Sequence, residues 1–464
     1  MNAGPKVHGY LPNDSPPLGQ LILLGFQHVL TMFPATVFVA AFTGFHVGTV
    51  LLASGVSTIV ALTLARRGIG SFIPLFYGSS FSYIAAYLGI VATMTGGLPA
   101  FGQPVPDEVL STMQAGIVVT GILNIIVGFV VRAVGKAAVD KVLPPVVTGS
   151  VAAIIGFGLA FAALDLANAN WLVAIVTLVV TILLSVYMQN RGFIGMLPVL
   201  LGAIIGYLFS AVVDPGSVNL TSVAAAPLLQ VPHFTFPSFS GPLVFTAIAS
   251  ISIMAIATIP ESTAHLYQIS LYVDRFAEEA GREKYGLENY IGFNLILDGI
   301  GDFINGLVGA TAGTNYGENN SLMVITRNYS GPAIMAAGVI AILLGFVGKL
   351  AAIVGTVPLA VSGGLAVYLF GVIGMQGFAL MQEHKVSMFD PRNLAVGAVI
   401  MVVGIGGNIG FPGGFLPVSI PVVFPSGLPA IATASVLGIV LNAIFLVFAP
   451  PQVGKVVAAA SAAD

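Results

Sequence analysis

The sequence lacks cysteine altogether and carries few charged residues. Its 464 residues include 15 Lys and Arg and 18 Asp and Glu, so that 7% of the chain is charged while 57% is hydrophobic. The absence of cysteine excludes disulfide bonds and thiolate metal sites. Because soluble domains carry about 25% charged residues, water is not the solvent for most of this chain. We expect neither a cofactor nor a metal site.

The sequence does contain many apolar runs of about 20 residues, the length of one membrane span. We interpret the chain as an all-α integral membrane protein with fourteen transmembrane segments. The expected spans are residues 17–43, 47–65, 71–93, 110–133, 143–164, 170–188, 193–213, 243–270, 290–309, 311–329, 331–350, 357–381, 394–411 and 428–449.

The positions of the basic residues agree with an even number of spans. With the N-terminus inside, all but one of the 15 Lys and Arg fall in inner loops or at the termini, and Lys349 is the exception. This positive-inside bias predicts a multi-pass protein of the plasma (inner) membrane with both termini cytoplasmic. The residues assigned to the inside are Lys6, Arg66, Arg67, Arg132, Lys136, Lys141, Arg191, Arg275, Arg282, Lys284, Arg327, Lys385, Arg392 and Lys455.

Residues 214–242 divide the chain into two halves of seven expected spans each. This segment is rich in Pro, Ser, Thr and Phe and contains no Lys or Arg, as an outer linker would. Because seven is an odd number, the two halves have opposite orientations. Such inverted repeats are the plan of many transporters.

The third span of each half is interrupted. Residues 71–83 and 313–330 begin as irregular sequence and become helical near Phe81 and Glu318. Irregular backbone is tolerated in a membrane only where protein buries it or where it lines a cavity. We therefore expect two short extended segments that face each other at a midplane binding site, each followed by a half-helix.

Acidic residues inside the expected spans are costly and are therefore candidates for function. Glu261 and His265 are four residues apart, so they share one helix face. An acid and an imidazole placed in this way can exchange a proton, and a structural hydrogen-bonded pair is the alternative. The acids inside spans are Glu261, Asp298, Asp302 and Glu318.

Other polar residues within the spans are interpreted mainly as structural. Asp298 and Asp302, also four apart, are expected to support the site from behind or to accept hydrogen bonds from backbone near the interruptions. Gln27 and His28 lie in the middle of the first span. For these two residues, hydrogen bonding between helices is favoured over contact with a ligand.

The groups at the interruptions favour a neutral ligand. The carboxylates of Glu261 and Glu318 would repel an anion, and Arg327 is the one basic residue near either interruption. Helix starts supply free N–H groups, and Phe81 supplies an aromatic face. A flat, uncharged ring with N–H and C=O edges, such as a pyrimidine-dione or an oxopurine, matches this set, because N–H groups bond strongly to carboxylates.

Enzyme and channel functions are disfavoured. The sequence contains no His-Glu-x-x-His motif, no nucleophile elbow and no phosphate-binding Gly-rich loop. A channel needs a continuous pore, whereas two interruptions that meet at the midplane favour one enclosed site. No nucleic-acid partner is expected.

Several short motifs together carry a family resemblance that extends over nearly the whole chain. They are residues 27–33 (QHVLTMF), 77–81 (YGSSF), Glu261 with His265, 315–319 (NYGEN), 325–327 (ITR) and 370–374 (FGVIG). With these motifs the sequence resembles the nucleobase/ascorbate transporters, the nucleobase–cation symporter-2 family, and most closely the bacterial uracil permeases.

The resemblance implies a two-domain architecture. A core domain would comprise residues 17–133 and 243–350, and a gate domain would comprise residues 143–213 and 357–449. The implied activity is proton-coupled uptake of a nucleobase, uracil preferred, by movement of the core against the gate in the lipid bilayer. The gate domain would also pair two copies into a homodimer.

The resemblance also implies roles for individual residues. Glu261 and Glu318 would accept hydrogen bonds from the base, and the backbone N–H groups of Phe81 and Gly317 would donate to its carbonyl groups. Tyr316 belongs to the same substrate-binding set. The residues expected to support the site are Gln27, His28, Asp298, Asn319 and Phe370.

His265, together with Glu261, would couple the proton. The chain departs from the uracil permeases at Phe370, where they have a Tyr whose hydroxyl belongs to the polar network. Purine-transporting relatives tend to have Gln where Glu318 stands, and the acid therefore favours uracil. A xanthine or other purine permease, or an anion transporter of the same architecture, is the alternative.

Overall fold

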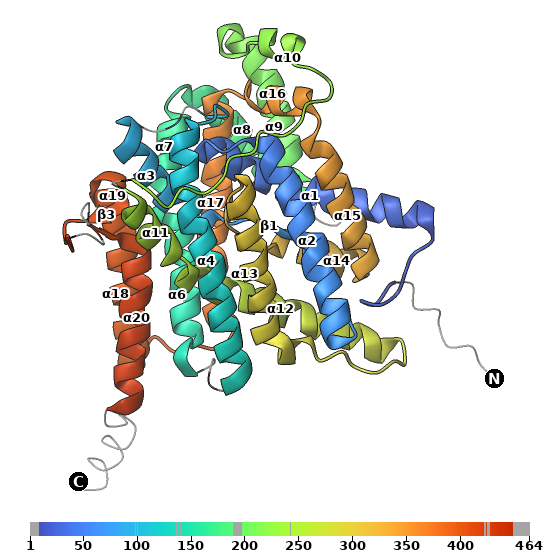
Figure 1. Ribbon diagram of the computed structural model, residues 1–464, viewed down its shortest axis with the longest axis vertical. Helices are drawn as coiled ribbons and strands as arrows, with labels where there is room; N and C mark the ends of the chain where they lie inside the picture. The colour runs from blue at the N-terminus through green and yellow to red at the C-terminus, as the bar shows by residue number, and fades with distance from the viewer. Residues whose placement is uncertain are drawn as a thin grey trace, which may run out of the picture.

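The computed structural model describes residues 9–97, 99, 101–135, 138, 141–188, 197–241, 243–421, 424 and 427–448. Within these residues, nine helical segments are long and apolar enough to cross a membrane, and four shorter apolar helices accompany them. The protein is therefore a helical membrane protein, as its composition predicts. In Figure 1 the long helices run between an upper end that carries α10 and α16 and an opposite, lower end.

The first half of the chain contains one short strand among its helices. The strand β1 (Tyr77–Ser79) is followed by a 3₁₀ turn, η1 (Phe81–Tyr83). The helices are α1 (Leu18–Thr43), α2 (Val47–Ile69), α3 (Ile84–Thr95), α4 (Asp107–Val134), α6 (Pro145–Gly158), α7 (Ala160–Ala167), α8 (Trp171–Tyr187) and α9 (Pro198–Val213), with α10 (Thr221–Ala225) in the linker.

The second half also contains a short central strand, β2 (Gly313–Asn315), among its helices. Its other elements are α11 (Val244–Ser252), α12 (Ala255–Glu279), α13 (Ile291–Val308), α14 (Gly317–Thr326), α15 (Gly331–Gly345), α16 (Gly348–Val354), α17 (Leu359–Glu383), α18 (Pro391–Met401), α19 (Gly407–Gly410), β3 (Phe415–Leu416), β4 (Leu428–Pro429) and α20 (Ala430–Val447).

One predicted span differs clearly from the observed elements. Residues 243–270 were expected as a single span, but the helix breaks between α11 and α12, and α12 continues to Glu279. The continuation is charged rather than apolar, so hydropathy does not reveal it. Arg275 and Glu279 form an ion pair one turn apart (3.4 Å), and such pairs support exposed helix.

Large apolar side chains cover the outside of the helices. Phe129 on α4, Leu183 on α8 and Val440 on α20 are all exposed, and each of these three helices has further exposed apolar residues. In water such a surface would drive aggregation, whereas lipid acyl chains solvate it. The helix backbones satisfy their own hydrogen bonds, as a membrane requires.

Glycine allows helices from the two halves to pack closely. A Cβ atom added at Gly55 on α2 would lie 2.3 Å from the carbonyl oxygen of Gly338 on α15, and one at Gly121 on α4 would lie 2.6 Å from that of Gly299 on α13. Small residues at such crossings let membrane helices approach and gain van der Waals contact. The first half therefore packs directly against the second.

The strands β1 and β2 pair at the centre of the bundle. They are antiparallel, with Tyr77 opposite Asn315 and Ser79 opposite Gly313, and every residue of both strands is buried. Each strand gives the other the backbone partners that lipid cannot supply. The two extended segments expected from the interrupted spans are thus present and face each other.

Asp302 connects this strand pair to the surrounding helices. Its Oδ1 accepts hydrogen bonds from the Tyr77 hydroxyl (2.5 Å) and the Gly313 N–H (2.8 Å), and its Oδ2 accepts one from Asn124 Nδ2 (2.9 Å). A single carboxylate on α13 therefore ties β1, β2 and α4 together. Asp302 thus accepts a hydrogen bond from the backbone of an interrupted span, as expected for an acid in this region.

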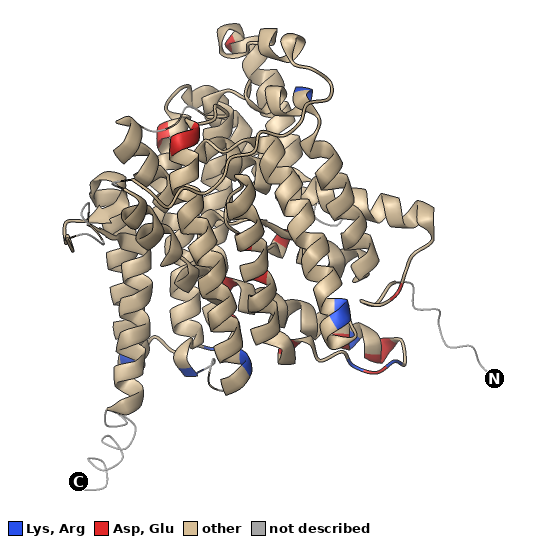
Figure 2. Ribbon diagram, viewed as in Figure 1, with Lys and Arg blue, Asp and Glu red and all other residues tan. Residues whose placement is uncertain are grey.

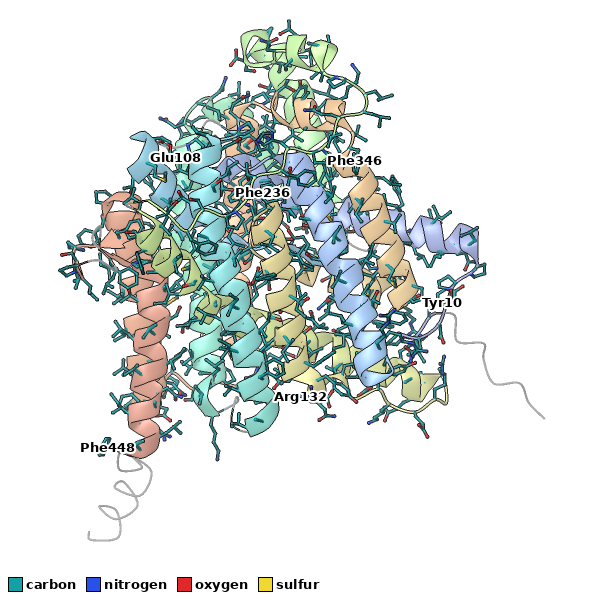
Figure 3. All side chains as sticks on the ribbon, in the orientation of Figure 1. Tyr10, Glu108, Arg132, Phe236, Phe346 and Phe448 are labelled. Carbon is teal, nitrogen blue, oxygen red and sulfur yellow. The ribbon has the colours of Figure 1, made fainter. Side chains whose placement is uncertain are left out.

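Charged residues are distributed unevenly along the long axis. Figure 2 shows most of the basic residues gathered at the lower end, and acids at both ends and within the bundle. Figure 3 places Arg132 at the lower end of α4 and Glu108 at its upper end. Lys6, Lys136, Arg191, Lys455, the start of the span 193–213 and the end of the span 428–449 lie outside the described residues.

Candidate functional site

Glu261 and Glu318 approach each other from two different helices. Glu261 lies on α12 directly after Pro260, and Glu318 is in the first turn of α14. The two helices adjoin there, because Nε2 of His265, one turn after Glu261, lies 2.7 Å from where a Cβ atom on Gly317, directly before Glu318, would be. Ser82, in the turn after β1, donates a hydrogen bond from Oγ to Glu261 Oε2 (3.3 Å). The acids therefore lie together beside the end of the strand pair.

A few polar side chains near these acids are exposed. Glu318 and Ser321 are exposed on one face of α14, and Gln268 is exposed on α12. Gln268 Oε1 accepts a hydrogen bond from Asn320 Nδ2 (3.3 Å). Polar side chains directed at acyl chains are costly. We therefore interpret these three side chains as facing water inside the protein rather than lipid.

His265 packs against the beginning of α14. Its Nδ1 lies 2.7 Å from the carbonyl oxygen of Asn315, and because a carbonyl only accepts hydrogen bonds, Nδ1 carries the proton. On the other side of the ring, Nε2 lies 2.7 Å from where a Cβ atom on Gly317 would be. His265 therefore stands next to Glu318 and presents Nε2 toward the first turn of α14.

Both half-helices begin at the strand pair. In η1 the Ser80 hydroxyl accepts a hydrogen bond from the Ser82 N–H (3.2 Å), and in α14 the side chain of Tyr316 does not cap the helix. The first N–H groups of a helix have no partner within it and form its positive end. The first backbone N–H groups of η1 and of α14 therefore lie at the strand pair, beside the two acids.

An aromatic cluster lies on the other side of η1. The ring of Phe81 is 6.2 Å from that of Phe38 on α1 and 5.9 Å from that of Phe370 on α17, while Phe38 and Phe370 are 5.8 Å apart. Two of the three contacts are edge-on, a favourable geometry for aromatic pairs. The cluster joins α17 to α1 and to the turn that follows β1.

Tyr316 connects β1 to α1 through its hydroxyl. The hydroxyl donates to the carbonyl oxygen of Ser79 (2.9 Å) and lies 2.9 Å from Thr36 Oγ1. Its ring covers Gly78, where an added Cβ atom would lie 2.5 Å away. The side chain of Tyr316 thus holds the strand pair against α1, and its contact with a substrate stays a prediction.

Asn319 and His28 connect α14 to α1. Asn319 Nδ2 donates to the carbonyl oxygen of His28 (3.1 Å) and lies 3.1 Å from His28 Nδ1. His28 is buried, and the adjacent Gln27 accepts a hydrogen bond from Thr31 on its backbone oxygen (3.0 Å). His28 therefore takes part in hydrogen bonding between helices, the role that the sequence analysis favoured for it.

Asp298 belongs to a buried polar network behind the strand pair. Ser262 donates a hydrogen bond to Asp298 Oδ2, and Asn315 Nδ2 approaches the same oxygen (3.3 Å). Asn294 Nδ2 donates to Ser262 Oγ (2.8 Å). The network links α12, α13 and β2 and includes Ser262, the residue next to Glu261.

Sequence reasoning missed several residues of this region. Phe38 looks like any apolar residue in the middle of a span, and Ser82, Ser262 and Asn294 are small polar residues common in membrane helices. The one available signal for Ser262 and Ser82 was their position next to Glu261 and Phe81. Phe38 had no such signal, because its contact depends on how α1 crosses the strand pair.

A buried strand pair that begins two half-helices inside a membrane-spanning bundle is an arrangement typical of secondary transporters. A family model described as "Permease family" matches residues 19–413. The chain belongs to this permease family, so it is a transporter and not an enzyme. Its recognition as a relative of the nucleobase/ascorbate transporters is confirmed.

Similar proteins support this assignment over the full chain. A uracil permease of Bacillus caldolyticus is 35% identical over 407 residues, which cover 85% of this chain and 87% of that protein. A uracil permease of Bacillus subtilis (strain 168) is 31% identical over 447 residues, which cover 93% and 94%. One of Escherichia coli (strain K12) is 32% identical over 467 residues, which cover 97% of each.

Solved structures share the fold at low sequence identity. The transmembrane domain of the cyanobacterium bicarbonate transporter BicA matches with a TM-score of 0.55 and 14% identity, covering 86% of this chain and 98% of that one. The murine anion transporter Slc26a9, in its inward-facing state, matches with a TM-score of 0.60 and 12% identity, covering 94% and 69%. At these identities the likeness concerns the fold alone.

Proposed function

We propose that this permease imports a nucleobase together with protons, and that uracil is the preferred base. The observation that carries the proposal is the placement of Glu261 and Glu318 on the adjoining helices α12 and α14, beside the starts of two half-helices. The relatives named uracil permease, which match 85% or more of this chain, support the choice of base.

In the proposed complex the acids recognise the N–H edge of the base. Glu261 and Glu318 accept hydrogen bonds from its ring nitrogens, and the backbone N–H groups of Phe81 and Gly317 donate to its carbonyl oxygens. Phe81 also offers its ring to one face of the base. An analogue with a methylated ring nitrogen would leave a carboxylate without its donor, which costs about 1–3 kcal/mol or more for a charged group.

Glu261 and His265 carry the coupled proton in this proposal. Nδ1 of His265 already donates to Asn315, so Nε2 is the nitrogen that can take up a proton. Glu261 lies one helical turn away on the same face of α12. The proton would therefore be held beside the substrate, between α12 and the first turn of α14.

The proposed architecture is fourteen spans in two inverted repeats. The nine long helical segments and four shorter apolar helices occupy thirteen of the expected spans, and β2 with α14 occupies the remaining one. The core (17–133 and 243–350) would move against the gate (143–213 and 357–449) in an elevator-type motion. The aromatic cluster, in which Phe370 meets Phe38 and Phe81, lies on this proposed boundary.

The proposed orientation places the lower end of Figure 1 in the cytoplasm. The described basic residues gather there, while Lys349 on α16 lies at the opposite end, where its Nζ donates to the carbonyl oxygen of Val223 (3.1 Å). The positive-inside rule then assigns the linker to the outside. We further propose plasma-membrane localisation, cytoplasmic termini and a homodimer that pairs through the gate domain.

The direct test is uptake of radiolabelled uracil by cells that lack their own uracil transport. Glu261→Gln and Glu318→Gln should each reduce uptake by about 10- to 100-fold, since a hydrogen bond to a charged group contributes about 1.5–3 kcal/mol. Glu283→Gln, in the exposed segment after α12, is the matched control and should transport normally. Normal uptake by both site variants would refute the site.

Competition identifies the base. Uptake of radiolabelled uracil is measured in cells that express the unchanged protein. The competitors, added one at a time, are unlabelled uracil, thymine, xanthine, hypoxanthine and ascorbate. Strong competition by xanthine and hypoxanthine but not by thymine would indicate the purine alternative. If the cells took up labelled bicarbonate or sulfate but no labelled uracil, the anion alternative would replace the nucleobase proposal.

A further inference from the structure

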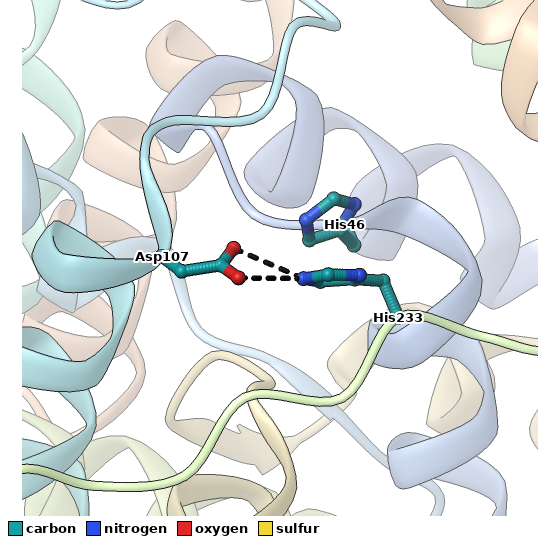
Figure 4. A group of neighbouring side chains, drawn as sticks. All are labelled: His46, Asp107 and His233. Atoms are coloured by element: carbon teal, nitrogen blue, oxygen red, sulfur yellow. Dashed lines mark hydrogen bonds and ion pairs between the residues drawn. The ribbon is translucent and has the colours of Figure 1, made fainter.

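We propose that His46, Asp107 and His233 form a binding site for a divalent transition metal, with Zn²⁺ the best match. One nitrogen or oxygen ligand atom from each residue lies within 4.8 Å of the others. Figure 4 shows the carboxylate of Asp107 pointing at His233, with the ring of His46 beside them. The three residues are far apart in the sequence, so no short sequence motif predicts the site.

The spacing of His233 and Asp107 is close to that of two ligands on a zinc ion. His233 Nε2 lies 3.0 Å from Asp107 Oδ1 and 3.1 Å from Oδ2, and the two imidazole rings are 4.3 Å apart between centroids. With bonds of about 2.0–2.2 Å, ligand atoms on a tetrahedral zinc are about 3.3 Å apart. The ligand nitrogen of His46 lies within 4.8 Å of the other two ligand atoms, and a rotation of its side chain that brings it closer would complete three protein ligands.

The donor set selects for the kind of metal. Two imidazoles and one carboxylate suit Zn²⁺ and similar first-row ions, whereas Mg²⁺ and Ca²⁺ prefer oxygen ligands. Three protein ligands leave a fourth position for water. The side chains of His233 and Asp107 are 46% and 61% exposed, so an ion can enter and water can occupy the fourth position.

The backbone on which the ligands stand is already held in place. His46 directly precedes α2, and Asp107 is the first residue of α4. The linker that carries His233 is attached to both helices. Thr49 Oγ1 donates to the carbonyl oxygen of His233 (2.5 Å), and Gln114 Nε2 donates to that of Thr235 (2.8 Å). Binding therefore requires little ordering of the chain, which favours affinity.

A surface ion pair between Asp107 and His233 is the simpler alternative. Such exposed pairs contribute about 0–1 kcal/mol, and a pair does not account for the second imidazole. A metal would join α2, α4 and the linker at one point. Metal binding at this site does not depend on which substrate is transported. Measurements of metal binding therefore succeed or fail independently of the uracil uptake assays.

The test measures metal binding to the purified, metal-stripped full chain after removal of any affinity tag. Zn²⁺ titrated by calorimetry should bind with a stoichiometry of one per chain, and Co²⁺ should give the intense visible absorption of a tetrahedral site. His46→Ala and His233→Ala should each weaken Zn²⁺ binding at least 100-fold, and Asp107→Asn about 10- to 100-fold. His384→Ala, which changes an exposed histidine after α17, should bind Zn²⁺ normally.

Thermal unfolding provides a second readout that controls for misfolding. Zn²⁺ should raise the unfolding temperature of the unchanged protein and of His384→Ala, because a ligand that binds only the folded state stabilises it. The three site variants should unfold at normal temperatures without metal and should not respond to it. Equal Zn²⁺ affinity in the unchanged protein and in His46→Ala would overturn the three-ligand site and leave only the ion pair.

Discussion

Gly317 is a position at which the protein has no room for a side chain. An added Cβ atom would lie 2.7 Å from His265 Nε2, and the ring cannot easily retreat because Nδ1 donates to Asn315 (2.7 Å). The same residue begins α14 and precedes Glu318. The lack of a side chain therefore lets an imidazole, a helix start and a carboxylate occupy one small region.

Gly317→Ala should therefore weaken uracil binding. The methyl group pushes His265 or the start of α14 aside, and overpacking of this kind costs about 1–3 kcal/mol. We expect the apparent affinity, measured by equilibrium binding to purified protein, to fall about tenfold. Gly371→Ala is the control, because a Cβ atom at that position on α17 meets no other atom of the described residues within 4 Å. Unchanged binding in Gly317→Ala would show that His265 is not positioned by this contact.

His265→Ala should separate proton coupling from substrate binding. Loss of the ring removes the proposed proton acceptor, whereas Glu261, Glu318 and the helix starts remain. We expect uracil accumulation driven by a pH gradient in proteoliposomes to fall by tenfold or more, and uracil binding to fall much less. Equal losses in both measurements would contradict a coupling role and would indicate a role in binding or packing.

At the scale of elements, the paired strands β1 and β2 are held by side chains from the helices around them. Asp302 on α13 accepts three hydrogen bonds, from Tyr77, Gly313 and Asn124. Ser262, Asn294 and Asp298 form a second connection to Asn315. Because a short strand pair has few contacts of its own, these buried polar groups determine where the half-helices begin.

Asp302→Ala should destabilise the protein, whereas Asp302→Asn should be tolerated better. Alanine leaves several buried donors without a partner, at about 1–3 kcal/mol each. Asparagine keeps one oxygen that can accept from Tyr77 and Gly313. Its amide N–H can donate to Asn124 Oδ1 if the Asn124 amide flips, and this oxygen has no hydrogen bond among the described residues. The measurement is the unfolding temperature in detergent, and equal temperatures for the two variants would argue against this account.

At the scale of the whole molecule, the two halves of the chain pack against each other rather than side by side as separate bundles. α4 of the first half lies against α13 of the second, with Gly121 facing Gly299, and α2 lies against α15 with Gly55 facing Gly338. The strand pair is likewise shared, one strand from each half. The candidate site exists only because both halves contribute to it.

The absence of cysteine makes the proposed orientation directly testable. Ser222→Cys places a thiol on α10 at the upper end of the molecule, and Glu283→Cys places one in the exposed segment that follows α12. A membrane-impermeant maleimide should label the first variant in intact cells and the second only after permeabilisation. The unchanged protein, which has no cysteine, gives the background, and the reverse labelling pattern would invert the topology.

Much of the architecture could be predicted because hydropathy is a property of consecutive residues. A run of about 20 apolar residues specifies a membrane helix wherever it occurs, and irregular sequence inside such runs marks backbone that needs partners. The acids Glu261 and Glu318 stood out for the same reason, since a charge in an apolar run is costly. The end of α12 at Glu279 escaped prediction because its last turns are charged.

The sequence by itself determined that the chain is a membrane protein, where its two central interruptions lie and which acids are unusual. Only the tertiary structure decided which residues come together: His265 with the start of α14, Phe38 with Phe370, and His46 with Asp107 and His233. The physical reason is that solvation acts on each segment separately. Contacts between distant segments instead depend on how closely their helices can pack, which is a property of pairs of surfaces.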